Sequence, residues 1–167
     1  MQTIKRKLLM YSDEVIKQII KPSRLYKSFI QCVPPRNTHQ AGNRIFKRKG
    51  GGFFIGKSLK HKKTKSFLEL HLTQNAPPQP YNGNLKVKVD WIYPWRTSET
   101  KKNKKLGILP CSKRPDCDNI AKGLLDAMQA TGWFKDDGQI YDLSICKYYG
   151  EQCGINIEMT ETIVCRL

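Results

Sequence analysis

The segment from Asp118 to Gly132 is the feature that most constrains the fold. Its apolar residues recur at intervals that place them on one side of an α-helix, and they are Ile120, Leu124, Leu125 and Met128. Glycine often follows the last residue of a helix, so we expect Gly132 to be the C-cap. A helix with one apolar side needs another layer to pack against, so the fold includes at least one helix packed on a second element.

Five other stretches predict β-strands. Residues 85–93 alternate apolar and polar side chains with a period of two, the pattern of a half-buried strand. Residues 28–33 are strand-like and end at a proline pair, and the run 53–55 is typical of an edge strand or of one arm of a hairpin. Residues 140–149 and 155–160 also alternate, and the short connection between them predicts an antiparallel hairpin.

A second helix is expected from Ser58 to Leu72, with lysines along its polar side. Residues 1–26 mix apolar and basic side chains, including a short helix that ends before Pro22, and we interpret them as an amino-terminal extension. The length of the chain suits one compact domain, for which we expect residues 27–167. Together these elements predict an α+β fold, with a mixed sheet of four to five strands and helices packed against it.

Charge is distributed unevenly along the chain. The formal net charge is +16, and residues 1–113 hold 25 Lys/Arg against 5 Asp/Glu, whereas residues 114–167 hold 5 against 9. So basic a chain favours a polyanionic partner, either nucleic acid or an acidic membrane surface. The acidic side chains gather in the last third of the chain, where a bound cation would reconcile them with a phosphate backbone.

Basic side chains are concentrated in two segments. Residues 97–105 have almost nothing to bury and predict a mobile loop whose lysines contact phosphates. A second basic stretch surrounds the glycine run 50–52. The nucleic-acid contacts expected from these two segments are Lys101, Lys102, Lys104, Lys105, Arg44 and Lys47.

The six cysteines form no Cys-x-x-Cys pair, and no histidine lies at ligand spacing from them, so a zinc module is not expected. No secretory signal and no membrane span is recognisable in the sequence. We therefore expect a cytoplasmic protein with reduced thiols and without a membrane partner.

Carboxylates flank the helix that begins at Asp118. Asp116 precedes it, Lys122 lies one turn inside it, and the pair Asp136 and Asp137 follows it. Clustered carboxylates repel one another unless a proton or cation lies between them, and Mg²⁺ prefers such hard oxygen ligands. A bound ion would lower the pKa of a water molecule for attack on a phosphodiester, while Lys122 would offset the developing charge.

Each of these residues also has a structural explanation. Asp118 is a good helix N-cap, Asp136 and Asp137 precede a glycine in a sequence typical of a turn, and Lys122 suits an exposed helix position. A pair of aspartates separated by one residue also occurs in sites for nucleotide sugars. It is the combination of these residues that indicates phosphodiester hydrolysis.

The combination resembles the RusA family of Holliday-junction resolvases, which occurs in phages, prophages and bacteria. The likeness extends over residues 28–161 and is absent from residues 1–26. It rests on the pattern R-x-D-x-D-N-x-x-K that begins at Arg114, on Asp126 and Ala127 inside the helix, on G-[WF]-x-x-D-D-x-Q-[IV] from Gly132, and on Lys147 in the following strand.

The resemblance implies a homodimer that binds four-way DNA junctions and makes paired cuts with Mg²⁺ or Mn²⁺. It implies that Asp116, Asp118 and Asp137 bind the metal and that Lys122 assists them, with Asp136 as the reserve choice for a ligand. Arg114 and Lys147 are expected to contact DNA. The function is then a metal-dependent endonuclease that resolves Holliday junctions in recombination and repair. The alternatives are a nuclease that prefers flaps or forks, and a basic nucleic-acid-binding protein without catalysis.

Overall fold

The computed structural model describes residues 20–37, 43–57 and 59–164. The capping role expected of Ser58 lies outside these residues, and so does most of the short helix expected before Pro22. The last two residues of that stretch, Ile20 and Lys21, are described and lie in a strand instead. The described elements are, in chain order, β1 (Ile20–Gln31), β2 (Asn43–Lys47), β3 (Phe53–Lys57), α3 (Leu59–Gln74), β4 (Asn84–Pro94), α4 (Lys101–Lys104), β5 (Ile108–Pro110), α5 (Cys117–Ala130), the 3₁₀ turn η2 (Asp137–Gln139), β6 (Ile140–Gly150) and β7 (Gly154–Val164).

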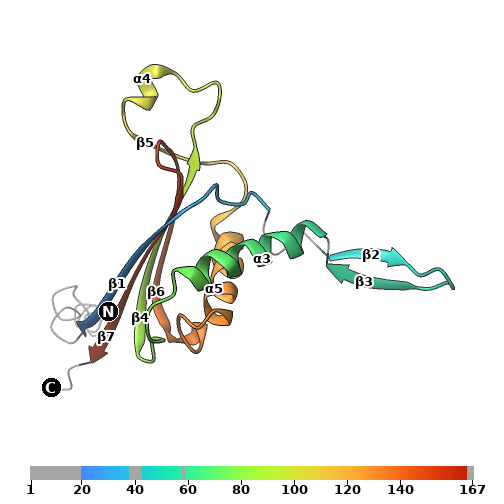
Figure 1. Cartoon of the computed structure of the whole chain (residues 1–167), viewed down its shortest axis with the longest axis horizontal. Helices are drawn as coiled ribbons and strands as arrows, with labels where there is room; N and C mark the ends of the chain where they lie inside the picture. The colour runs from blue at the N-terminus through green and yellow to red at the C-terminus, as the bar shows by residue number, and fades with distance from the viewer. Residues whose placement is uncertain (1–19, 38–42, 58, 165–167) are drawn as a thin grey trace, which may run out of the picture.

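A five-stranded mixed sheet forms the body of the molecule, with strands in the order β1-β7-β4-β6-β5. β4 lies at its centre, antiparallel to β7 and parallel to β6. Helices α3 and α5 lie on the same side of this sheet (Figure 1). The expected α+β fold with a mixed sheet is therefore confirmed.

The core fills the space between the sheet and the two helices. Along β4, every second side chain from Leu85 to Tyr93 is buried, and the side chains between them are exposed or half-buried. This confirms the half-buried strand expected from the alternation. Trp133, which follows α5, is fully buried and donates a hydrogen bond from Nε1 to the carbonyl of Leu72 in α3 (3.0 Å), so the two helices are joined beneath their surface.

The helix expected after Asp118 is α5, and its buried side chains are Ile120, Leu124, Ala127 and Met128. Gly132 follows the C-cap Thr131 and has a φ of 78°, a conformation that glycine adopts without strain. Because this turn redirects the chain, Trp133 and Phe134 enter the core immediately after the helix.

The antiparallel hairpin expected from residues 140–160 is wrong in its pairing. β6 and β7 follow one another in the chain, but β4 lies between them. The register shows how this occurs, since Pro94 pairs with Gly150 on one side of β4 and Ile92 pairs with Gly154 on the other. Two neighbouring strand spacings amount to about 10 Å, a distance that a short extended connection can cross.

Three further differences concern the ends of the sheet and its loops. β1 begins at Ile20, opposite Val164 of β7, so the sheet includes residues before the expected start of the domain at residue 27. Residues 97–105 contain a one-turn helix, α4, instead of being irregular throughout, and its N-cap Thr100 accepts a hydrogen bond from the backbone N–H of Asn103 (3.2 Å). Loop composition alone does not reveal such a local cap.

The third difference is β2, which was not expected as a strand. It pairs with β3 as a two-stranded hairpin that is not part of the five-stranded sheet. This hairpin projects away from the body at the start of α3 (Figure 1).

Among the described helices, none is both long and apolar enough to cross a membrane.

Candidate active site

Asp116 and Asp118 lie at the beginning of α5. Asp116 is the N-cap residue, with extended backbone angles, and its carbonyl accepts the first helical hydrogen bond from the N–H of Ile120 (3.1 Å). Its carboxylate makes no capping hydrogen bond. Asp118 lies in the first turn, so the structural explanation of Asp118 as the N-cap is wrong. Both side chains are exposed, and Lys122 follows one turn later, also exposed.

Lys147 of β6 fixes the segment that leads to Asp116. Its ammonium group donates hydrogen bonds to the carbonyls of Lys113 (2.8 Å) and Pro115 (2.7 Å). The backbone of Lys147 also accepts a hydrogen bond from the N–H of Cys111 (2.9 Å). Lys147 therefore has a structural contact that the sequence did not predict, while Arg114 in the same segment is exposed.

Asp136 and Asp137 lie beyond the other end of α5. Asp136 immediately precedes the turn η2, and Asp137 is the first residue of that turn. Asp136 caps this turn, because its Oδ1 accepts a hydrogen bond from the N–H of Gly138 (2.8 Å). Gln139 completes a capping box by accepting from the N–H of Asp136 (3.0 Å), and its Nε2 donates to the carbonyl of Gly83 (2.9 Å). Asp137 is exposed and has no such capping role. The two neighbouring aspartates thus have different environments.

Helix α5 separates the two groups of carboxylates. It has 14 residues, and at about 1.5 Å per residue it is about 20 Å long. Asp116 and Asp118 are at its start, and Asp137 follows its end. Within the part of the chain that the structure describes, no three His, Cys, Asp or Glu side chains lie close enough to share a metal ion. Within a single chain, Asp116 and Asp118 share the start of α5 and Lys147 holds the backbone before Asp116, whereas Asp137 lies beyond the other end of the helix.

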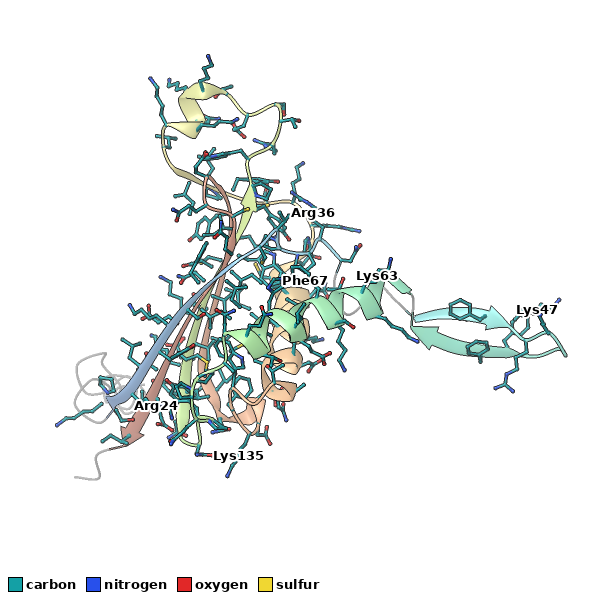
Figure 2. All side chains as sticks on the ribbon, viewed as in Figure 1. Arg24, Arg36, Lys47, Lys63, Phe67 and Lys135 are labelled. Carbon is teal, nitrogen blue, oxygen red and sulfur yellow. The ribbon has the colours of Figure 1, made fainter. Side chains whose placement is uncertain are left out.

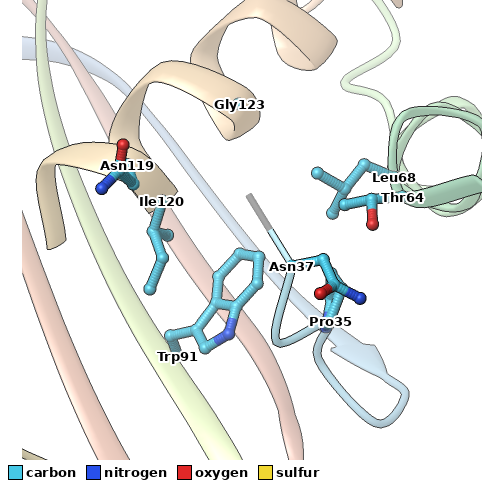
Figure 3. A pocket seen from close by; sticks show the side chains of 8 residues that line it. All are labelled: Pro35, Asn37, Thr64, Leu68, Trp91, Asn119, Ile120 and Gly123. Atoms are coloured by element: carbon cyan, nitrogen blue, oxygen red, sulfur yellow. The ribbon is translucent and has the colours of Figure 1, made fainter. Parts of the chain in front are cut away.

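A small pocket lies beside the start of α5, between α3, β4 and the segment after β1 (Figure 3). Asn119 and Trp91 are among its lining residues. The Oδ1 of Asn119 and the Nε1 of Trp91 are both buried without a hydrogen-bond partner among the described residues. A buried polar group left in this way is costly, and a water molecule bound to it would satisfy it. Asn119 was visible in the sequence only as part of the motif after Asp118.

A comparison with protein-family models identifies the relatives of this chain. Residues 34–160 match the model described as Endodeoxyribonuclease RusA. The chain belongs to the RusA family. The match includes all three aspartates proposed from the resemblance and begins after β1, so it spans the rest of the sheet up to residue 160, both long helices and the candidate site.

Curated relatives of this chain come from two phages and a bacterium. The crossover junction endodeoxyribonuclease rusA of Lactococcus phage r1t is 34% identical over 96 residues, 56% of this chain and 69% of the phage protein. The protein of the same name from Enterobacteria phage HK97 is 38% identical over 63 residues, 36% of this chain and 52% of the phage protein. An uncharacterized protein of Bacillus subtilis (strain 168), YqaN, is 33% identical over 107 residues, 61% of this chain and 75% of that protein.

The basic residues expected to contact DNA lie on two separate projections. Lys101, Lys102, Lys104 and Lys105 are exposed on α4 and directly after it, at one end of the sheet (Figure 1). Lys47 is exposed on the β2–β3 hairpin, and Arg44 lies in the same strand. The structure thus distributes positive charge over two projections of this RusA-family chain, whereas α5 lies on the body of the molecule (Figure 1).

Proposed function

We propose that this chain is a divalent-metal-dependent endonuclease that hydrolyses phosphodiester bonds in branched DNA and resolves Holliday junctions in recombination and repair. The observation that carries the proposal is the pair Asp116 and Asp118, exposed at the start of α5 in a chain of the RusA family. Neither carboxylate is used as a helix cap. Two hard, anionic oxygen donors, two residues apart at the start of one helix, fit Mg²⁺, for which Mn²⁺ would substitute.

Asp116 and Asp118 would hold the metal, which supplies an activated water and neutralises charge on the phosphate. The two hydrogen bonds from Lys147 fix the backbone that leads to Asp116, so they would position this carboxylate before DNA binds. Lys122, exposed one turn into α5, would bind the phosphate. Asp137 is a better third ligand than Asp136, whose carboxylate already caps η2.

A second copy of the chain would supply this third ligand. β6 is an edge strand before Tyr148, because β5 pairs only with its last three residues. The open part carries Tyr141 and Leu143, which are 49% and 40% exposed. Unpaired edges with exposed apolar side chains favour pairing with another strand.

Pairing of two β6 strands about a two-fold axis would be antiparallel. The start of one β6, which follows the turn η2 that contains Asp137, would then lie beside the end of the open part of the other, where Lys147 holds the segment before Asp116. Each site of this homodimer would combine Asp116 and Asp118 of one copy with Asp137 of the other. Two equivalent sites suit paired cuts in opposed strands.

Cutting of a synthetic four-way junction tests the activity. With Mg²⁺ the protein should nick the junction symmetrically, and it should lose this activity in EDTA. Asp116→Asn should bind the junction without cutting it. Glu158→Gln is the matched control, because Glu158 pairs with Lys27 (2.9 Å) and lies on β7, away from α5 and from the open part of β6. Cutting by Asp116→Asn at the wild-type rate would contradict the mechanism.

Mixing two inactive variants tests the shared site. In a heterodimer of Asp116→Asn with Asp137→Asn, one composite site holds both substitutions and the other holds none. The mixture should therefore regain single nicks, although neither variant cuts alone. If each site belonged to one chain, mixing would restore nothing.

Flaps and replication forks should be assayed beside the junction, because a RusA-family nuclease with another branch preference would have the same site residues. Faster cutting of a flap or fork would favour that alternative. If no DNA substrate were cut with Mg²⁺ or Mn²⁺, a basic binding protein without catalysis would be the better interpretation.

A further inference from the structure

The β2–β3 hairpin has an unusual surface for an element of a folded domain. Its strands pair from Asn43 with Lys57 to Lys47 with Phe53. The tip is ordered by a hydrogen bond from the N–H of Arg48 to the carbonyl of Gly52 (3.0 Å), and Gly52 has a φ of 81°. Lys47 lies at the far end of the hairpin from α3 (Figure 2). Strands of this length extend about 17 Å, so the hairpin carries its tip well beyond the sheet.

Large apolar side chains are exposed on both faces of this hairpin. Ile45 and Phe53 lie on one face and are 72% and 70% exposed. Phe46 and Phe54 lie on the other face and are 38% and 44% exposed. None of these four side chains joins the hydrophobic core. An isolated hairpin is marginally stable, and apolar groups on both of its faces indicate a partner that covers them.

Each face places a flat aromatic surface beside a cation. Phe46 and Phe54 stack with their ring centroids 5.4 Å apart and an angle of 24° between the rings. The guanidinium of Arg48 lies 5.9 Å from the ring of Phe54. On the opposite face, Phe53 is the cross-strand partner of Lys47. Rings beside positive charges suit a partner that has both flat surfaces and anionic groups.

The charge of the hairpin identifies the class of this partner. Residues 43–57 hold five Lys/Arg and no Asp/Glu, and no acidic residue occurs between Glu14 and Glu69. An apolar protein surface would cover the rings and leave the cations unpaired. DNA supplies phosphates for the cations and base faces for the rings. In an intact duplex these faces are stacked on one another, whereas at a branch point some become accessible.

We propose that the β2–β3 hairpin enters the branch point of its DNA substrate and stacks Phe53, and the pair Phe46 and Phe54, on bases that lose their neighbours there. This inference rests on the proposed action on branched DNA and adds the part of the substrate that the hairpin contacts. Lys47 and Arg48 hold the flanking phosphates. The hairpin recognises a break in base stacking, which distinguishes a branch from linear duplex without reading sequence.

Fluorescence of 2-aminopurine at the branch point of a four-way junction tests this contact. The measurement is made with the full chain in EDTA, where no cutting is expected. Binding of the wild type should raise the fluorescence as the base loses its stacked neighbour. Phe53→Ala should lose most of this rise and weaken junction binding by about tenfold, while binding of a linear duplex of the same length stays unchanged.

Three further variants separate stacking from other effects. Phe53→Leu keeps apolar area without a ring and should behave like Phe53→Ala, whereas Phe53→Trp should restore the rise and add tryptophan quenching on junction binding. Leu70→Ala is the control, because Leu70 is a 58% exposed apolar residue on α3, outside the hairpin. It should bind and unstack the junction as the wild type does.

Several outcomes would overturn the inference. The first is that 2-aminopurine fluorescence does not change when the wild type binds the junction. The second is that Phe53→Ala loses as much affinity for linear duplex as for the junction. The third is that Phe53→Ala has a different oligomeric state from the wild type. The last result would assign the hairpin to contact with a second copy. A protein that unstacks the base but never cuts with Mg²⁺ would keep this inference and remove the proposed catalysis, so the two failures are distinguishable.

Discussion

Replacement of Lys147 by methionine is the sharpest test of how the aspartates are held. Methionine keeps the length of the side chain and removes the two hydrogen bonds to the carbonyls of Lys113 and Pro115. A hydrogen bond to a charged group contributes about 1.5–3 kcal/mol. Lys147 is half-buried and Lys113 is exposed, so solvent replaces part of this contribution. We expect a loss of about 2–3 kcal/mol for the pair.

For a chain of this size, such a loss should lower Tm by about 5–10 °C. Urea unfolding followed by circular dichroism measures the change directly, and Lys88→Met is the control because Lys88 is exposed on the opposite face of β4. Junction cutting should fall as well, since the backbone before Asp116 loses its tether. A contrary result would be that Lys147→Met has the same free energy of unfolding as Lys88→Met but binds DNA weakly. Lys147 would then be the DNA contact that the motif suggested, and its two hydrogen bonds would contribute little to stability.

Three other predictions follow from individual contacts. Asp136→Ala should lower the free energy of unfolding by about 1 kcal/mol in urea melts, since it removes a cap, whereas Asp137→Ala should change it by less than about 0.5 kcal/mol; equal effects would contradict the division of roles. Burial and the nearby Cys153 raise the pKa of the Cys32 thiol from 9.0 to about 11. Any stability that this shift contributes is complete below pH 9 and disappears as the pH rises towards 11. At pH 8, mass spectrometry should find the exposed Cys117 labelled much faster than Cys32, and Mn²⁺ should slow only Cys117. Junction affinity should fall steeply with rising salt, and a flat response would exclude the basic surface as the main contact.

Local periodicity was sufficient to predict the elements around the site. The apolar spacing of α5 and the alternation of β4 both arise because one side of each element is buried. One-sided burial produces a periodic pattern of apolar residues that can be read from the sequence. The neighbours of a strand cannot be predicted in this way. A period of two in the sequence shows which face of a strand is buried, but it does not show which other strand pairs with it. For this reason β6 and β7 were expected to pair, although β4 separates them.

The candidate site shows the same division. The motif indicated which aspartates to consider, but a motif lists residues by their order in the chain. It did not reveal that Asp136 is engaged by Gly138 while Asp137 is not, because that depends on the geometry of a three-residue turn. The motif placed Asp116 before the helix and Asp137 after it, but it did not reveal whether the two carboxylates meet, because the order of residues along the chain gives no distance between side chains.

The 14-residue length of α5 has a consequence for the geometry of cleavage. If each site joins the start of one α5 to the end of the other, the separation of the two cut phosphates is set by a rigid helix and not by flexible loops. A junction would have to adjust its arms until two scissile bonds match that fixed interval. The protein would then select the shape of the bound DNA before any bond is broken, and both strands would be cut in one geometry.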